Sequence, residues 1–149
     1  MQFTIIQLTD TAGLNDLRYF LEQSKLPSDD VVLAGNCYVG IRDAQNNLIA
    51  SGGLEFHEPY ALLRSVAVDP GYQGNGYAIS IVKHLISTVQ QSHFKAVYLL
   101  TETAEMYFSK LDFRTVERDD VPEVIKDSYQ YHHACPATAT CMVRHLAST

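Results

Sequence analysis

The stretch with the clearest chemical signature is Gln73-Gly74-Asn75-Gly76-Tyr77-Ala78. Before it, Leu63 to Val68 is rich in apolar and β-branched residues and is typical of a strand, and Asp69 to Tyr72 is typical of the turn that ends one. After it, apolar residues recur at helical spacing from Ala78 to Val89. A glycine loop at the start of a helix directs unbonded backbone N–H groups and the positive end of the helix dipole to one place. We therefore predict that this loop binds a phosphate group.

Two common phosphate-binding motifs are excluded at this loop. A dinucleotide fingerprint read from Gly74 requires a third glycine where Ile79 stands, and a P-loop ending at Gly76 requires lysine where Tyr77 stands. A glycine-rich helix start without a ligand remains the alternative. The pattern that is left, Q-x-x-G-x-A, resembles the pyrophosphate-binding signature R/Q-x-x-G-x-G/A of the GNAT superfamily of acetyl-CoA-dependent N-acetyltransferases.

The resemblance implies a fold and a cofactor. The fold is α/β (α+β), a single GNAT domain over residues 1–149 with a mixed, mostly antiparallel central sheet of about seven strands, helices on its flanks and a central β-α-β unit for acetyl-CoA. The strands 63–68 and 95–101 are expected to splay apart and hold the pantetheine arm of acetyl-CoA. Backbone N–H groups of Val66, Ala67 and Val68 would then polarise the thioester oxygen, while the loop 73–78 holds the pyrophosphate.

A second GNAT signature, commonly N-x-x-A-x-x-(L/F)-Y-x-x-L-G-F, resembles the segment from Thr101 to Phe113. The match of this segment to the signature implies that Thr101 and Phe108 lie beside the cofactor. Thr101 replaces the asparagine, Asp112 the glycine, and Phe108 the tyrosine that protonates the leaving thiolate in many members. Phenylalanine has no proton to donate, and we do not expect the adjacent Tyr107 to substitute directly because one residue along a helix turns a side chain by about 100°. These departures leave open a CoA-binding sensor or partner module without catalysis.

The C-terminal segment narrows the resemblance further. Cys135 to Met142, C-P-A-T-A-T-C-M, resembles the ending of short acetyltransferases found with arsenic-resistance genes, which are themselves similar to short N-acetylglutamate synthase-like enzymes. The acceptor implied is the amino group of a small amino acid such as glutamate, or of an analogue that contains arsenic or phosphorus. Another small amine remains the alternative acceptor.

Candidate catalytic and substrate-binding residues lie on the strands around residues 48–68. We predict that Glu55 is the general base, directly or through a water, with His57 in reserve; the alternative for Glu55 is a solvated carboxylate. Arg64 is a candidate clamp for an acceptor carboxylate, or else an ordinary outward-facing residue. Ser65 and Cys135 complete the predicted substrate-binding set, although small buried cysteines more often only pack.

The remaining elements are assigned from periodicity and turn residues. The sequence predicts a first strand over 2–8, a helix capped by Asp10 or Thr11, an antiparallel meander of strands over 37–42, 48–56 and 63–68, and a buried strand over 95–101 parallel to the last of these. It also predicts a helix from about Asp120 to His132 and a C-terminal strand over 140–145. That last strand is a plausible exposed edge for a homodimer.

Composition limits the partners and the compartment. The chain has 149 residues, 46% of them hydrophobic, and a net charge of -6 without a cluster of Lys and Arg, so we predict neither nucleic acid nor an anionic membrane as a partner. No apolar run approaches membrane length, and the N-terminus lacks the pattern of a signal peptide. Three cysteines without C-x-x-C spacing favour reduced thiols and a cytoplasmic location. We predict no metal site, since His132-His133-x-Cys135 lacks a suitably spaced fourth ligand.

Overall fold

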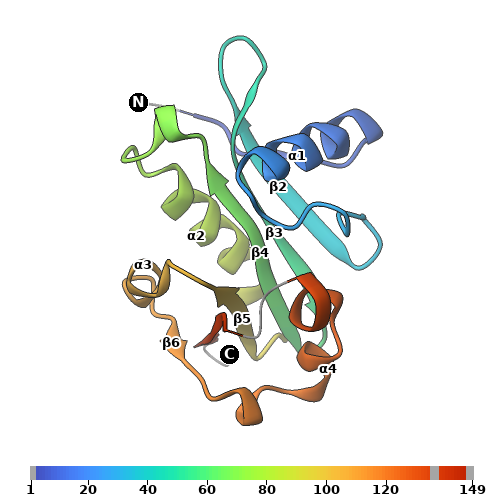
Figure 1. Ribbon diagram of the computed structural model, residues 1–149, viewed down its shortest axis with the longest axis vertical. Coiled ribbons are helices and arrows are strands. Elements are labelled where there is room, and N and C mark those ends of the chain that lie inside the picture. Colours follow the sequence, from blue (N-terminus) through green and yellow to red (C-terminus); the bar gives the residue numbers. More distant parts are fainter. Residues whose placement is uncertain (1–2, 135–137, 147–149) are drawn as a thin grey trace.

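A computed structural model describes residues 3–134 and 138–146. Seven strands form one sheet in the order β1-β2-β3-β4-β5-β7-β6, and helices cover its faces (Figure 1). The strands are β1 (Ile6–Gln7), β2 (Asn36–Arg42), β3 (Leu48–His57), β4 (Tyr60–Val68), β5 (Ala96–Thr101), β6 (Arg114–Thr115) and β7 (Thr140–His145). The α-helices are α1 (Thr11–Gln23), α2 (Tyr77–Gln90), α3 (Glu105–Ser109) and α4 (Glu123–Lys126). Short helical turns occupy η1 (Pro70–Tyr72), η2 (Arg118–Asp120) and η3 (Gln130–Ala134).

The sheet is antiparallel except at its centre. Strands β1 to β4 pair antiparallel in sequence order, β4 and β5 pair parallel through α2, and β7 pairs antiparallel with both β5 and β6. This arrangement confirms the predicted fold class, the predicted meander and the predicted central β-α-β unit.

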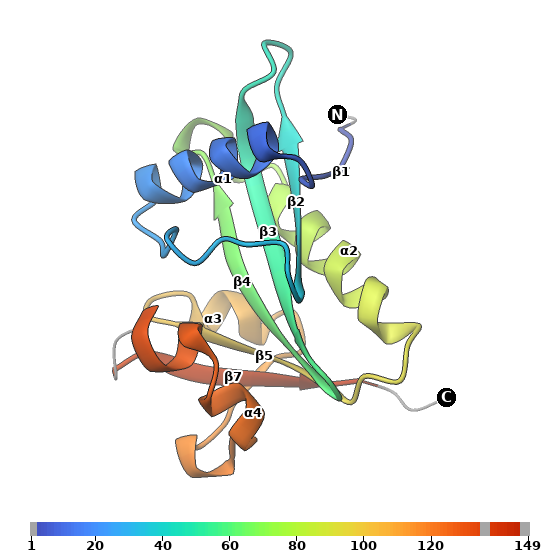
Figure 2. The same ribbon diagram turned by 90° about the vertical axis from the view of Figure 1, so that its right-hand side faces the viewer.

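Strand β4 leaves β5 part-way along its length. In the described residues, their pairing is confined to Tyr60–Leu62 against Ala96–Tyr98, although β4 continues to Val68. The register with β3 shifts opposite Ser51 and Gly53, and Ser65 takes a left-handed conformation with φ of 60°. Such a bulge bends a strand and increases its twist. Figure 2 shows the result, because β5 and β7 run across the direction of the upper part of β4.

Two consecutive glycines let layers pack closely on both faces of β3. Helices α1 and α2 lie on opposite faces of the sheet (Figure 2). A Cβ at Gly52 would collide with Ile81 of α2, and a Cβ at Gly53 would come within 2.5 Å of the ring of Tyr38 on the other face. These contacts explain a Gly-Gly pair inside a strand, where glycine otherwise weakens the sheet.

The helix predicted from about Asp120 to His132 is wrong. Helix α4 ends at Lys126, and the chain turns before η3 begins at Gln130. The hydroxyl of Ser128 donates to the Ile125 carbonyl at 2.7 Å and accepts from the Tyr131 N–H at 3.2 Å. Hydrogen bonds of this kind compete with a continuous helix.

The predicted exposed edge over 140–145 is also wrong. Strand β7 lies between β5 and β6, and all six of its residues pair with β5. The first strand is shorter than predicted, since β1 comprises Ile6–Gln7. Helix α1 begins as predicted, with the Asp10 carboxylate accepting from the Gly13 N–H at 2.7 Å.

Candidate active site

The glycine loop connects the end of β4 to the start of α2. The Asp69 carboxylate accepts from the Gly71 N–H at 2.8 Å and fixes the turn η1. Gly74 and Gly76 follow with φ of 85° and 80°, a left-handed conformation that other residues rarely adopt. Among the described residues nothing lies within 4 Å of the position a Cβ would take at either glycine. The N-terminus of a 14-residue helix is therefore open to an anion.

A cavity of about 510 Å³ lies between this loop, the end of β4 and α3. Its size falls within the range of small-molecule and cofactor sites. Most of the predicted cofactor residues line it together: Val66, Ala67, Val68, Gln73, Gly74, Gly76, Tyr77, Ala78 and Phe108. It lies where β4 diverges from β5, so the residues after Leu62 on the free edge of β4 can offer backbone groups to a ligand.

Two predicted cofactor residues have other roles in the described structure. The Asn75 amide donates to the Tyr72 carbonyl at 3.0 Å and shapes the loop. The Thr101 hydroxyl accepts from the Ala104 N–H at 3.0 Å and closes the turn before α3. Sequence reasoning missed four lining residues: Tyr72, Ile79, Ala104 and Tyr107. These residues lie beside or within the two GNAT signatures, and this proximity was the signal in the sequence that could have identified them.

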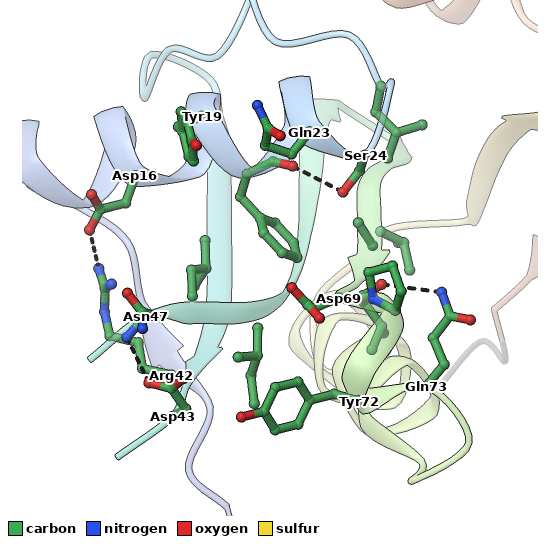
Figure 3. A pocket seen from close by; sticks show the side chains of 18 of the residues that line it. Asp16, Tyr19, Gln23, Ser24, Arg42, Asp43, Asn47, Asp69, Tyr72 and Gln73 are labelled. Atoms are coloured by element: carbon green, nitrogen blue, oxygen red, sulfur yellow. Dashed lines mark hydrogen bonds and ion pairs between the residues drawn. The ribbon is translucent and has the colours of Figure 1, made fainter. Parts of the chain in front are cut away.

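A larger cavity of about 910 Å³ adjoins the first along the end of β4. The two share Val66, Ala67, Val68, Tyr72 and Gln73. Figure 3 shows side chains from α1, from the β2–β3 hairpin and from the loop after β4 around this larger cavity. On its wall Arg42 forms an ion pair with Asp16 at 2.9 Å. The end of β4 is therefore accessible from a second, more polar space.

Arg64 is buried and holds two carboxylates. Its side chain is 1% exposed, and its guanidinium donates to Asp30 at 2.6 and 2.7 Å and to Glu55 at 2.9 Å. The Arg64 Nε also donates to the hydroxyl of Ser65 at 3.0 Å, and the guanidinium lies 5.7 Å from the centre of the Tyr38 ring. Arg64 is thus neither outward-facing nor free, and an acceptor carboxylate would have to replace Asp30.

Glu55 connects Arg64 to His57. Its Oε2 accepts from Arg64 at 2.9 Å, and its Oε1 lies 2.9 Å from Nε2 of His57. Glu55 is 6% exposed, so it is not a solvated carboxylate, whereas the His57 side chain is 23% exposed. His57 is therefore the member of this group that a solute can reach.

Burial and the neighbouring charges shift the pKa values of Glu55 and Arg64 in opposite directions. Burial alone would raise the pKa of Glu55, but the hydrogen bond from His57 and the charge of Arg64 outweigh it and hold that pKa below its ordinary value. Burial alone would lower the pKa of Arg64, but Asp30 and Glu55 raise it. Glu55 is ionised at neutral pH and is a weak base, because a carboxylate with a lowered pKa binds a proton less readily.

The other sequence predictions concern cysteines, metals and membranes. Cys135 lies outside the described residues. Cys141 is buried against β5, and burial raises the pKa of its thiol to about 11. Within residues 3–134 and 138–146, no group of three or more His, Cys, Asp and Glu is placed to hold a metal ion, and no helix is long and apolar enough to cross a membrane.

The open start of α2 and the divergence of β4 from β5 are two features expected from the sequence resemblance to the GNAT superfamily. A comparison with a family model decides whether the chain belongs to that family. A model of the acetyltransferase (GNAT) family matches residues 7–113, well over half of the chain. The chain belongs to the GNAT family of acetyltransferases. Acetyl-CoA is accordingly its acetyl donor.

Solved structures resemble this GNAT protein over nearly its whole length. A GNAT-family acetyltransferase from Staphylococcus aureus Mu50 gives a TM-score of 0.75 at 16% identity and covers 98% of this chain and 100% of its own. Rv2747 from Mycobacterium tuberculosis, in complex with CoA and NLQ, gives 0.73 at 17%, covering 97% and 99%. N-acetylglutamate synthase from Neisseria gonorrhoeae, complexed with coenzyme A and N-acetyl-glutamate, gives 0.78 at 18%, covering 99% and 36%. This chain spans about a third of that synthase. At these identities the likeness concerns the fold.

Proposed function

We propose that this GNAT protein transfers the acetyl group of acetyl-CoA to the amino group of a small amino acid or an amino-acid-like compound. The observation that supports this acceptor class is the two-point contact between Arg64 and the Asp30 carboxylate, at 2.6 and 2.7 Å. A guanidinium that already holds one carboxylate in this way has the geometry to hold another. Asp30 lies in the connection between α1 and β2, which can move away from the sheet more easily than a strand can.

The proposed reaction is a direct transfer in a ternary complex. The neutral amine attacks the thioester carbonyl, the new C–N bond forms as the C–S bond breaks, and coenzyme A leaves as the thiolate. Backbone N–H groups on the free edge of β4 at Val66 to Val68 polarise the carbonyl oxygen. The thiolate leaves without help from Phe108, which has no proton to donate.

We assign the amine proton to His57, supported by Glu55, through intervening water, because His57 pairs with Tyr60 at the other end of β4 from Val66 to Val68. In the tautomer with a proton on Nε2, His57 donates to Glu55 Oε1 across 2.9 Å and keeps the Nδ1 lone pair available for a proton. The hydrogen bond from His57 is itself a cause of the lowered pKa of Glu55, which leaves Glu55 an ionised acceptor and a weak base. A peptide N-terminus titrates near pH 8, roughly, but the α-ammonium group of a free amino acid is more basic and is almost entirely protonated at neutral pH, so a base is needed to remove its proton.

The N-acetylglutamate synthase with a similar fold was solved with N-acetyl-glutamate. This likeness is consistent with glutamate or a glutamate analogue containing phosphorus or arsenic as the acceptor. An amine without a carboxylate is the second candidate, and it is favoured by the fact that Arg64 is fully occupied by Asp30 and Glu55.

The test uses matched pairs of acceptors. Thiol release from acetyl-CoA is measured with each amino acid and with the amine that lacks its α-carboxylate. We expect turnover with the amino acids and little with their partners. In Asp30→Ala, which frees one side of Arg64, we expect KM for carboxylate acceptors to fall about tenfold or more, since hydrogen bonds to charged groups contribute about 1.5–3 kcal/mol.

Asp29→Ala is the matched control, because Asp29 lies on the same connection and accepts from the exposed Tyr129 hydroxyl at 3.0 Å. It should leave KM unchanged. Equal turnover of both members of each pair, or a KM that rises in Asp30→Ala, would contradict a carboxylate site at Arg64.

A further inference from the structure

Ser51 on β3 holds the bulge of the neighbouring strand β4 through its hydroxyl. Ser51 is 0% exposed, and its Oγ donates to the backbone carbonyl of Ser65 at 2.7 Å. Ser65 is the residue with φ of 60°, and it lies where the register between β3 and β4 shifts. A buried side chain of β3 is therefore bonded to the backbone of β4 at its most irregular point.

This hydrogen bond compensates for one that the bulge disrupts. A bulge interrupts the ladder between two strands and leaves the extra residue without its ladder partner. A buried carbonyl without a partner is unfavourable, and Ser51 supplies one for Ser65. Ser65 is held a second time, because its own hydroxyl accepts from the Nε of Arg64 at 3.0 Å. Both the main chain and the side chain of Ser65 are thus fixed.

The bond from Ser51 also sets the direction of the next backbone N–H. In a planar trans peptide the C=O of one residue and the N–H of the following residue point in opposite directions, and the peptide between Ser65 and Val66 is trans. Because the Ser65 carbonyl points to Ser51 on β3, the Val66 N–H points away from β3. On the other side of β4, the pairing with β5 ends at Leu62. The Val66 N–H is therefore directed to the side of β4 from which β5 has diverged.

Val66 lies where the two cavities meet. It lines both the cavity of about 510 Å³ and the cavity of about 910 Å³. Transfer of an acetyl group requires two substrates in contact, and the residues common to both cavities surround a place where the occupants of the two can meet. An N–H whose direction the fold fixes in advance is a preorganised donor for the charge that develops on a reacting carbonyl oxygen.

We propose that Ser51 is a positioning residue for acetyl transfer, which aims the Val66 N–H at the thioester oxygen of acetyl-CoA through its bond to the Ser65 carbonyl. Ser51 itself touches neither substrate. The inference rests on the proposed function, in which N–H groups of Val66 to Val68 polarise this oxygen, and it names the side chain that holds one of them in place. The effect of Ser51 is on the transition state and not on the binding of coenzyme A.

The test compares Ser51→Ala with the wild type, since this change removes only the hydroxyl. We measure kcat for acetyl transfer and, by calorimetry, the dissociation constant of coenzyme A, which has no acetyl carbonyl. Loss of an oxyanion donor outright lowers kcat by about 10²–10³, so we expect a donor that is only misdirected to lower it by about tenfold or more. The affinity for coenzyme A should not change.

Infrared difference spectroscopy observes the polarisation itself. The ligand is acetyl-CoA labelled with ¹³C at the acetyl carbonyl, and no acceptor is added. A hydrogen bond to the carbonyl oxygen weakens the C=O bond and lowers its stretching frequency. We expect a lower frequency for acetyl-CoA bound to the wild type than for acetyl-CoA free in water, and a smaller lowering in Ser51→Ala. A purely structural role of Ser51 would leave the frequency of the bound ligand unchanged.

Ser128→Ala is the matched control. Ser128 is 5% exposed, its Oγ donates to the Ile125 carbonyl at the same distance of 2.7 Å, and it lines neither cavity. Loss of this hydroxyl should lower the melting temperature about as much as Ser51→Ala does, because each change leaves a buried carbonyl without its partner. Measured well below both melting temperatures, kcat and the carbonyl frequency should stay at their wild-type values in Ser128→Ala.

Two results would overturn the inference: a wild-type kcat and carbonyl frequency in Ser51→Ala, or an equal fall of kcat in Ser51→Ala and Ser128→Ala. If Ser51→Ala did not fold, Ser51→Cys would give the same comparison, since a thiol is a weaker donor than a hydroxyl. If the wild type neither turned over an acceptor nor lowered the carbonyl frequency, the proposed function would fail together with this inference. A lowered frequency in the wild type that persists in Ser51→Ala would refute the inference alone.

Discussion

Replacing Arg64 by alanine removes the cation that holds two carboxylates inside the protein. The Arg64 side chain is 1% exposed, and the side chains of Asp30 and Glu55 are 13% and 8% exposed. In Arg64→Ala these two carboxylates would lie close together without a counter-charge. Such a loss is more severe than the loss of a surface ion pair, because the remaining charges cannot be solvated fully.

The expected effect is large. Removal of one partner of a buried ion pair costs about 3–5 kcal/mol of the free energy of unfolding. For a domain of about 150 residues each kcal/mol lowers the melting temperature by roughly 2–4 °C. We therefore expect Arg64→Ala to melt about 6–20 °C below the wild type at neutral pH, as measured by circular dichroism.

The difference in melting temperature between Arg64→Ala and the wild type should shrink in acid. In the wild type the folded-state pKa of Glu55 lies below its ordinary value of 4.5, so its stabilising contribution is present above that value and is lost as pH falls through the folded-state pKa. In Arg64→Ala the hydrogen bond from His57 to Glu55 remains but the lowering effect of the cation is lost, so the pKa of Glu55 rises relative to the wild type and the carboxyl binds a proton more readily in the folded variant. The two melting temperatures should therefore approach each other below pH 4.5.

Arg42→Ala is the matched control. Arg42 and Asp16 form an ion pair at 2.9 Å, but their side chains are 17% and 52% exposed. Exposed pairs contribute at most about 1 kcal/mol, so this variant should melt within a few degrees of the wild type. If Arg64→Ala melted no lower than Arg42→Ala, or if its deficit were the same at both pH values, the account of the buried group would be refuted.

Three further variants test the loop, the base and the sheet. Gly76→Ala forces a side chain into the left-handed region at φ of 80°, at a cost of about 1–2 kcal/mol that a shift of the loop would relieve, so coenzyme A, whose pyrophosphate this loop is proposed to hold, should bind more weakly by calorimetry; an unchanged affinity would exclude a role for the loop geometry. His57→Ala should lower kcat about a hundredfold or more without changing KM for acetyl-CoA, and an unaltered kcat in steady-state assays would remove His57 as the base. Gly53→Ala places a Cβ 2.5 Å from the Tyr38 ring and should destabilise the fold by about 1–3 kcal/mol, with a melting temperature equal to that of the wild type as the contrary result.

Local sequence patterns were sufficient for the fold and for the glycine loop at the start of α2. Alternating and continuous apolar runs located the central strands, and helical spacing from Ala78 to Val89 located α2. Gly74 and Gly76 were interpretable because few residues other than glycine adopt positive φ. Each of these signals lies within a few residues of the feature that it predicts.

The environment of Arg64 could not be predicted in this way. Its partner Asp30 is 34 residues distant in the sequence and lies in a connection without periodicity. The bulge at Ser65 was equally hidden, since serine at φ of 60° carries no sequence signature of its own. Both features depend on tertiary contacts that form only when α1, β3 and β4 come together.

Tyr107 illustrates a third limit. Its helical position suggested that it would point away from the place expected for Phe108. In the folded chain α3 comprises only five residues, and the cavity extends around it far enough to be lined by both side chains. The angle between successive side chains of a helix does not predict how far a neighbouring cavity extends.

Thiol release from acetyl-CoA by the purified protein, with amino acids and their decarboxylated partners as acceptors, tests the central claim most directly. The account predicts turnover with α-amino acids, glutamate and its phosphorus- or arsenic-containing analogues among them, and little turnover with amines that lack the carboxylate. Binding of coenzyme A without turnover of any acceptor in the panel would contradict it, and would instead favour a CoA-binding sensor or partner module.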